Sequence, residues 1–228
     1  MALVAGATHR VQLGTSVLVL PIRNVLALAK SVSTLDVLSG GRVILAVGAG
    51  WLREEIEALG TPFATRVARL QEMVTALRLL WRDGAGSFDG EHIHFTRVVC
   101  EPRPIQPGGP PIWIGGSSDA AIRRAAAYGD GWHALGSNIE KLSRGKASFI
   151  GYAQTGSRRS EDLSFSTSAG LPPEPERAIQ RLLALQAIGI DHVVLNLQAE
   201  TPREVQIQLD WLATRVLPEL RSAEAALD

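Results

Sequence analysis

The hydrophobic positions of this chain fall into short continuous runs that alternate with longer segments in which apolar residues recur every three or four positions. A continuous apolar run predicts a strand buried on both faces, and the longer spacing predicts a helix with one buried face. This alternation is typical of a parallel sheet with helical crossovers. The predicted strands are 11–20, 42–47, 112–114, 131–135, 163–167 and 193–198, and the predicted helices are 24–38, 51–59, 66–81, 118–128, 175–188 and 202–220.

Two segments interrupt the alternation. Residues 83–106 contain several glycines and prolines around short extended pieces, which predicts a surface insertion. Residues 136–160 are polar, contain scattered glycines and show weak periodicity, so we expect a mobile loop over a pocket. Neither segment extends the predicted sheet.

The strand count leaves two α/β architectures open. A chain of 228 residues with 46% hydrophobic composition fits a single domain, 1–228, better than two. With six predicted strands, the sheet is either open and doubly wound, or a (β/α)8 TIM barrel that lacks its first two strand and helix units. Both architectures place ligand sites at the carboxyl ends of the strands.

The charge balance indicates a small-molecule ligand. Lysine and arginine number 23, aspartate and glutamate also number 23, and the formal net charge is zero. Without an excess of positive charge, we expect no nucleic-acid partner and no membrane partner. The single cysteine, Cys100, cannot form an internal disulfide, and no secretory signal or membrane-spanning run is evident, so we expect a packing role for Cys100 and a cytoplasmic location.

The most informative motif is the run IWIGGS at 112–117, an apolar strand that ends at two glycines and a serine before a helix. A backbone without side chains, beside the free N–H groups of a helix start, suits an anion such as a phosphate. The alternative is a tight strand-to-helix turn that needs a positive φ at glycine. The motif alone leaves both interpretations open.

Histidines supply the acid-base candidates. His133 lies at a predicted strand end, where a neutral imidazole can bind a ligand or transfer a proton. His92 and His94 alternate on a short extended piece, which favours a solvated hairpin face over a metal site. No other group of residues has metal-ligand spacing, so we expect no metal. Asp36 and Arg42 flank a helix-to-strand turn and are expected to form an ion pair.

Five segments together resemble the bacterial luciferase-like family, and in particular its branch that uses the deazaflavin coenzyme F420. They are LGTSVLVLPIR at 13–23, AKSVSTLDVLSGGRVILAVGAGW at 29–51, RVARLQEM at 66–73, PPIWIGGSS at 110–118 and AAYGDGW at 126–132. The segments extend over about 120 residues in the family's order, and their combination is specific.

The resemblance implies a (β/α)8 barrel with reduced F420 or flavin at its C-terminal face. It places a non-prolyl cis peptide behind the ring at Ser16 and Val17. Gly48, Ala49 and Gly50 are expected to line the ring and its side chain, and Gly115, Gly116 and Ser117 to hold the phosphate. His133 is the one candidate for a catalytic side chain.

The activity implied by the resemblance is hydride transfer between a reduced deazaflavin or flavin and a small organic substrate, as in an oxidoreductase or monooxygenase. Coenzyme F420 is the expected cofactor, with FMN as the alternative. Two other functions stay open: an FMN-dependent monooxygenase of the same family, and a catalytically inactive binding module.

The chain departs from the family pattern before its first predicted strand. Family members carry two further strand and helix units there, and these supply the acid and the histidine placed over the ring. We therefore expect an incomplete barrel of about six parallel strands with open edges and exposed apolar surface. The expected consequence is poor solubility, a homodimer formed through the gap, or weak cofactor binding.

Overall fold

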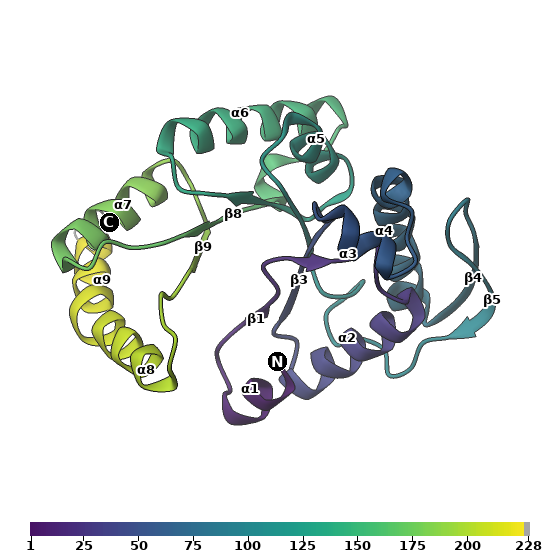
Figure 1. Ribbon diagram of the computed structural model, residues 1–228, viewed down its shortest axis with the longest axis horizontal. Coiled ribbons are helices and arrows are strands. Elements are labelled where there is room, and N and C mark those ends of the chain that lie inside the picture. Colours follow the sequence, from purple (N-terminus) through teal and green to yellow (C-terminus); the bar gives the residue numbers. More distant parts are fainter. Residues whose placement is uncertain (226–228) are drawn as a thin grey trace.

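A parallel sheet that curls into an open half barrel forms the centre of the protein, with helices on its convex side (Figure 1). The structure, a computed structural model, describes residues 1–225. The order of the strands is β1-β3-β6-β7-β8-β9, β2 also pairs with β3, and every pair in this sheet is parallel. The strands are β1 Leu13–Gly14, β2 Leu18–Val19, β3 Val43–Gly48, β4 Ala85–Asp89, β5 His94–Val99, β6 Ile112–Gly115, β7 Gly131–Leu135, β8 Ser164–Ala169 and β9 His192–Leu195.

Most of the helices lie between successive strands, as the apolar spacing predicts, whereas α1 precedes β1 and both α8 and α9 follow β9. They are α1 Ala2–Ala7, α2 Val25–Ser39, α3 Arg53–Ala58, α4 Arg66–Asp83, α5 Asp119–Tyr128, α6 Ile139–Thr155, α7 Pro175–Ala187, α8 Pro202–Trp211 and α9 Leu217–Ala225. The predicted fold class, an α/β architecture built on an incomplete barrel of about six parallel strand positions, is confirmed. Within the described residues, none of the helices has both the length and the apolar character needed to cross a bilayer.

The first predicted strand, 11–20, is divided in the structure. Leu13 and Gly14 pair with the start of β3, whereas Leu18 and Val19 pair with its end. The three residues between them leave the ladder, because the chain bulges toward the concave side of the sheet. Sequence periodicity did not detect this break, since the apolar run continues through it.

The prediction of a mobile loop at 136–160 is wrong. Most of this segment is helix α6, which Asn138 caps by accepting a hydrogen bond from the backbone N–H of Lys141 at 2.9 Å. The buried positions Leu142, Gly145, Phe149 and Ala153 follow a helical repeat. Two of these four residues are small, which weakened the apolar signal, and Gly145 is needed because a Cβ there would overlap the Trp132 ring.

The segment 83–106 forms the antiparallel hairpin β4–β5, which extends away from the sheet at the edge of the molecule (Figure 1). Three backbone N–H groups of the turn, at residues 91–93, donate to the carboxylate of Glu72 on α4 at 2.8–2.9 Å. The hairpin is therefore fixed to α4, and it lies apart from the strand ends that carry the site.

The expected ion pair between Asp36 and Arg42 is also wrong. The Asp36 carboxylate is fully buried and accepts hydrogen bonds from the backbone N–H of Ile105 and from the backbone and side chain of Gln106, at 2.7–3.1 Å. Arg42 instead donates to backbone carbonyls, including that of Val11 at 2.6 Å. The donors to this carboxylate lie in the segment that leads into β6, far along the chain from Asp36. Local sequence spacing therefore could not reveal them.

Asp36 offers a test of this connection between α2 and the segment before β6. Asp36→Asn turns an acceptor oxygen into a donor that faces other donors, so we expect the free energy of unfolding to fall by about 2–3 kcal/mol. Urea unfolding measures this change. Asp89→Asn is the control, because the Asp89 side chain is 97% exposed and its loss should change stability by less than about 0.5 kcal/mol. Equal effects of the two substitutions would contradict the assignment.

Candidate functional site

The Val17 side chain lies directly on two glycines at the ends of neighbouring strands. A Cβ atom built on Gly48, the last residue of β3, would lie 2.9 Å from a Val17 methyl, and one on Gly115, the last residue of β6, would lie 2.7 Å away. Real Cβ atoms do not approach this closely, so both positions require glycine. We call Val17, Gly48 and Gly115 the Val17 platform.

The platform belongs to the concave side of the sheet. Val17 packs against a small cluster formed by Ile44, Ala46 and Trp113, separate from the main core between the sheet and the helices. The peptide bond between Ser16 and Val17 is cis, as the resemblance implies. A flat ligand that lies against Val17 would therefore sit at the carboxyl ends of β3 and β6, where parallel α/β folds bind their ligands.

A buried histidine connects the bulge to the far side of the sheet. His133 Nε2 lies 2.9 Å from the Ser16 hydroxyl, and His133 Nδ1 lies 2.7 Å from the hydroxyl of Ser166 on β8. His133 and Ser166 are fully buried, whereas Ser16 is exposed. The imidazole thus spans from the residue before Val17, across β3 and β6, to β7 and β8.

Burial lowers the pKa of the His133 imidazole below its ordinary value. The ring is therefore neutral near pH 7, with one nitrogen that donates and one that accepts. A hydroxyl group can do either, so Ser16 and Ser166 satisfy both nitrogens whichever tautomer is present. This arrangement holds Ser16 in place and leaves the imidazole out of contact with solvent.

The turn after β6 has a fixed geometry. Gly116 has a φ of +128°, and a Cβ there would lie 2.8 Å from the Ala121 Cβ. Its N–H donates to the His133 carbonyl at 3.1 Å, and its carbonyl accepts from Trp132 Nε1 at 2.6 Å. The Ser117 hydroxyl bonds to both backbone groups of Leu135 at 3.0–3.1 Å. The backbone N–H of Gly116 is thus occupied by the protein itself.

Backbone donors for an anion lie just beyond this turn. The Ser118 side chain caps α5 by accepting from the Ala121 N–H at 3.2 Å. The N–H groups of Asp119 and Ala120 point out of the first helical turn, where they have no partner within the helix. These amides, with Ser117 beside them, are the donors that this turn can offer to a phosphate. The sequence run at 112–117 therefore allows both interpretations at once: Gly116 is required by the geometry of the turn, and the helix start beyond it is able to bind an anion.

The other residues assigned by the resemblance lie farther from the platform. Gly50 has a φ of +80° and would place a Cβ against Val19 and Ile56, so it serves the contact with α3. Its carbonyl accepts a hydrogen bond from Arg66 at 3.3 Å. Ala49 is half-buried and packs against the main core. The structure therefore groups Ser16, Val17, Gly48, Gly115 and His133, with Gly116 and Ser117 adjoining them.

The remaining histidine and cysteine candidates lie elsewhere. His94 Nδ1 contacts Asp89 at 3.0 Å on the exposed hairpin, and His92 lies in the same hairpin. Cys100 is buried and 3.8 Å from the Ser33 hydroxyl. Among residues 1–225, no group of His, Cys, Asp and Glu is arranged to hold a metal ion.

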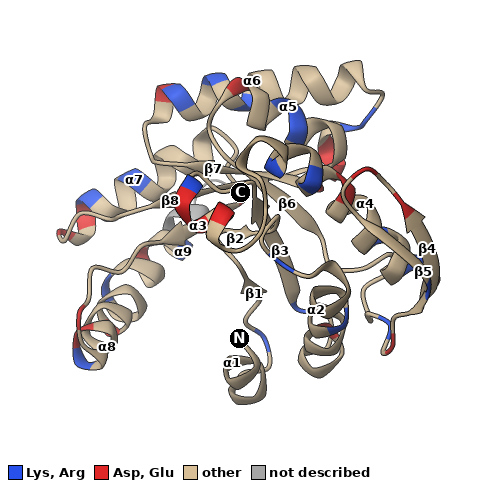
Figure 2. Cartoon of the chain, turned by 45° about the vertical axis from the view of Figure 1, so that its right-hand side comes forward, with Lys and Arg blue, Asp and Glu red and all other residues tan. Residues whose placement is uncertain are grey.

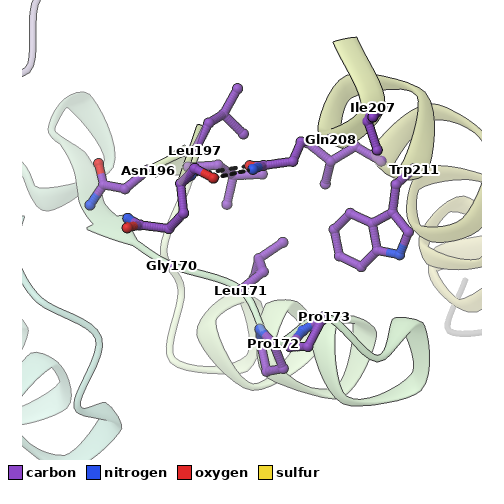
Figure 3. Close-up of a pocket in the computed structure, with 12 residues that line it drawn as sticks. Gly170, Leu171, Pro172, Pro173, Asn196, Leu197, Ile207, Gln208 and Trp211 are labelled. Carbon is purple, nitrogen blue, oxygen red and sulfur yellow. Dashed lines mark hydrogen bonds between the residues drawn. The ribbon is translucent and has the colours of Figure 1, made fainter. Parts of the chain in front are cut away.

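An apolar pocket of about 420 Å³ lies beyond the carboxyl ends of β8 and β9. Figure 3 shows the Trp211 and Ile207 side chains of α8 facing Leu171 and Pro172 across it. At one side, the amide of Gln208 exchanges hydrogen bonds with the backbone of Gln198. The pocket lies at the same end of the sheet as the Val17 platform.

Sequence reasoning missed Ser166 and the pocket-lining residues. Ser166 lies in a strand in which serine occupies positions 164, 166 and 168, a period-two pattern that places the three hydroxyls on one face. That alternation was a usable signal, because a buried row of hydroxyls needs polar partners. The Trp211 pocket had no comparable signal, since it depends on how α8 packs beside two loops.

The lowered pKa of His133 predicts how stability depends on pH. As pH falls below about 6.5, the unfolded chain gains a proton at this residue before the folded chain does, so stability falls. The free energy of unfolding therefore changes with pH, and replacing His133 with Asn should reduce this slope by up to about 1.4 kcal/mol per pH unit. Urea unfolding between about pH 5 and pH 7.5 measures it. The hydrogen bond to Asp89 raises the pKa of His94, so His94→Asn should change the slope in the opposite direction. Identical slopes in wild type and the His133 variant would refute the assignment.

Comparisons with known proteins agree with this geometry. The family model of luciferase-like monooxygenases matches residues 1–221. An FMNH2-dependent dimethylsulfone monooxygenase from Pseudomonas putida is 33% identical over 156 residues, which cover 64% of this chain and 43% of that protein. An F420-dependent glucose-6-phosphate dehydrogenase from Amycolatopsis mediterranei is 37% identical over 136 residues, which cover 58% of this chain and 40% of that protein. The chain thus spans less than half the length of these two curated relatives.

A solved structure extends the comparison to most of the chain. An F420-dependent secondary alcohol dehydrogenase, in complex with an F420-acetone adduct, superposes with a TM-score of 0.80 and 17% identity over 95% of this chain and 81% of that one. At this level of identity the likeness demonstrates the fold. The match to the family model over nearly the whole chain goes further: this protein belongs to the luciferase-like monooxygenase family.

Proposed function

We propose that the chain is an oxidoreductase that transfers hydride between reduced coenzyme F420 and a small organic substrate. The observation that carries the proposal is the Val17 platform, in which two strand-end glycines leave the room that the Val17 side chain occupies. The F420-dependent relatives support the choice of cofactor.

The residues present suit a planar ring with an anionic tail. Val17 offers an apolar surface to one face of a ring, and it packs against Ile44, Ala46 and Trp113 on the concave side. The N–H groups of Asp119 and Ala120 offer donors to a phosphate. When bound, the reduced deazaflavin ring supplies the hydride. The protein's part in this step is to hold the ring flat and to fix the phosphate.

His133 acts in this proposal as a positioning residue. The imidazole fixes the Ser16 hydroxyl, and through it the height of Val17 above β3 and β6. Because the imidazole is neutral and buried, it adds no charge beneath the ring. The apolar pocket near Trp211 supports a substrate with an apolar surface.

A second candidate is an FMN-dependent monooxygenase, favoured by the Pseudomonas relative. Titration of the protein with F420 and with FMN, followed by fluorescence and absorbance, distinguishes the two candidates. Binding of F420 alone supports the first proposal, and binding of FMN alone supports the second. If the protein binds either cofactor but neither transfers hydride to the substrates tested nor oxygenates them with O2, the inactive binding module is supported. Binding of neither cofactor would overturn all three.

The expected homodimer and cytoplasmic location belong to the same proposal. Leu3, Val11 and Leu38 are apolar and exposed by 87%, 55% and 69%, which supports burial against a second copy. The zero net charge supports a protein without a nucleic-acid partner.

The phosphate site is tested by adding a negative charge to the first turn of α5. Ala120 is exposed there, so Ala120→Asp introduces a carboxylate that the helix dipole tolerates but a bound phosphate repels. We expect the Kd for the cofactor to rise about tenfold, equivalent to ~1.4 kcal/mol, with no loss of thermal stability. Ala120→Asn has nearly the same shape without the charge and should leave the Kd within about twofold. Unchanged affinity in Ala120→Asp would remove the phosphate assignment.

A further inference from the structure

A recess of about 490 Å³ with several polar and charged lining residues opens between α5 and α6, beside the turn proposed to hold the phosphate. Ser117 lines the recess and also forms the turn, so the two are continuous. Trp132 lines the recess from the sheet side, and its Nε1 bonds to the Gly116 carbonyl at 2.6 Å. The recess is therefore joined to the Val17 side of the sheet through the Gly116 backbone.

Two positive side chains line the recess without an ion-pair partner. Lys141 and Arg144 are three residues apart on α6, so they lie on one face of the helix, and both are exposed. Within the described part of the chain, neither side chain makes an ion pair or a side-chain hydrogen bond. Figure 2 shows that basic residues, drawn in blue, occur along α6. Such a pair is available to a negatively charged ligand.

The one carboxylate that lines the recess is already neutralised. Asp119 accepts a hydrogen bond from Arg123 at 2.7 Å and one from the Tyr152 hydroxyl at 2.6 Å. Behind the recess, the half-buried Arg181 donates to the Ser137 carbonyl at 2.9 Å and adds another positive charge. The balance of charge in and around the recess is positive, although the whole chain has no net charge.

We propose that this recess binds a second anionic group of the ligand whose phosphate lies at Ser117, and that Lys141 and Arg144 are its charged partners. A carboxylate or phosphate meets two cations there, and the lining Ser137, Asn138 and Ser148 add polar groups. The inference rests on the proposed function, and it bears on the choice of cofactor. The deazaflavin coenzyme carries carboxylates beyond its phosphate, whereas FMN carries none.

The test compares two ligands and two double variants of the full chain. Lys141→Ala/Arg144→Ala removes both charges from the recess. Lys30→Ala/Arg203→Ala removes two exposed charges that have no partner in the described residues and that lie on α2 and α8. For each variant, the Kd of F420 bearing glutamyl carboxylates and the Kd of FMN are measured by fluorescence titration at low salt and expressed relative to wild type, so that differences between the two rings cancel.

We expect the recess variant to raise the Kd of F420 at least tenfold and the Kd of FMN less than twofold, while the control variant changes neither. The salt dependence of F420 binding should also weaken in the recess variant, because fewer charge contacts remain to be screened. If wild type binds F420 and the recess variant binds it equally well, the inference is wrong and the proposed function stands. A loss shared equally by F420 and FMN also overturns the inference, because it would place the cations at the common phosphate. If wild type binds neither ligand, both fall together.

Discussion

The contact of one valine with two glycines determines how the rest of the site is arranged. Val17 leaves the ladder between β1 and β2 and occupies the space that side chains at Gly48 and Gly115 would fill. Both glycines are the last residues of their strands, so the apolar surface is presented where β3 and β6 end. A methyl group at either position would displace the bulge.

The bulge is held from two directions. Thr15 donates its hydroxyl to the Ala46 carbonyl at 2.6 Å, which ties the bulge to the adjacent strand β3. His133 ties Ser16 to β7 and β8, several strands away. Because β1 and β2 have only two residues each, these side-chain contacts add to the backbone hydrogen bonds and the packing that fix Val17. A neutral imidazole suits this position, since a permanent charge would be costly to bury there.

Sequence predicted the elements better than the contacts between them. The order of strands and helices followed from the apolar periodicity, and the glycines at 48 and 115 stood at predicted strand ends. Helix α6 was missed because Gly145 and Ala153 replace larger apolar residues in its buried stripe. The partners of Asp36 and of His133 were missed because they lie 33 to 117 residues away along the chain, beyond any local pattern.

The distribution of charge also depends on contacts that the sequence does not reveal. A net charge of zero argues against a large positive field, but it averages over the whole surface. Asp119 is neutralised by Arg123, while Lys141 and Arg144 form no ion pair within residues 1–225, so the positive charge near the Ser117 turn arises from pairing and not from composition. The turn itself has the same character. Its glycines satisfy the geometry of the backbone, and the helix that follows offers backbone donors, so a structural requirement and the proposed anion site involve the same few residues.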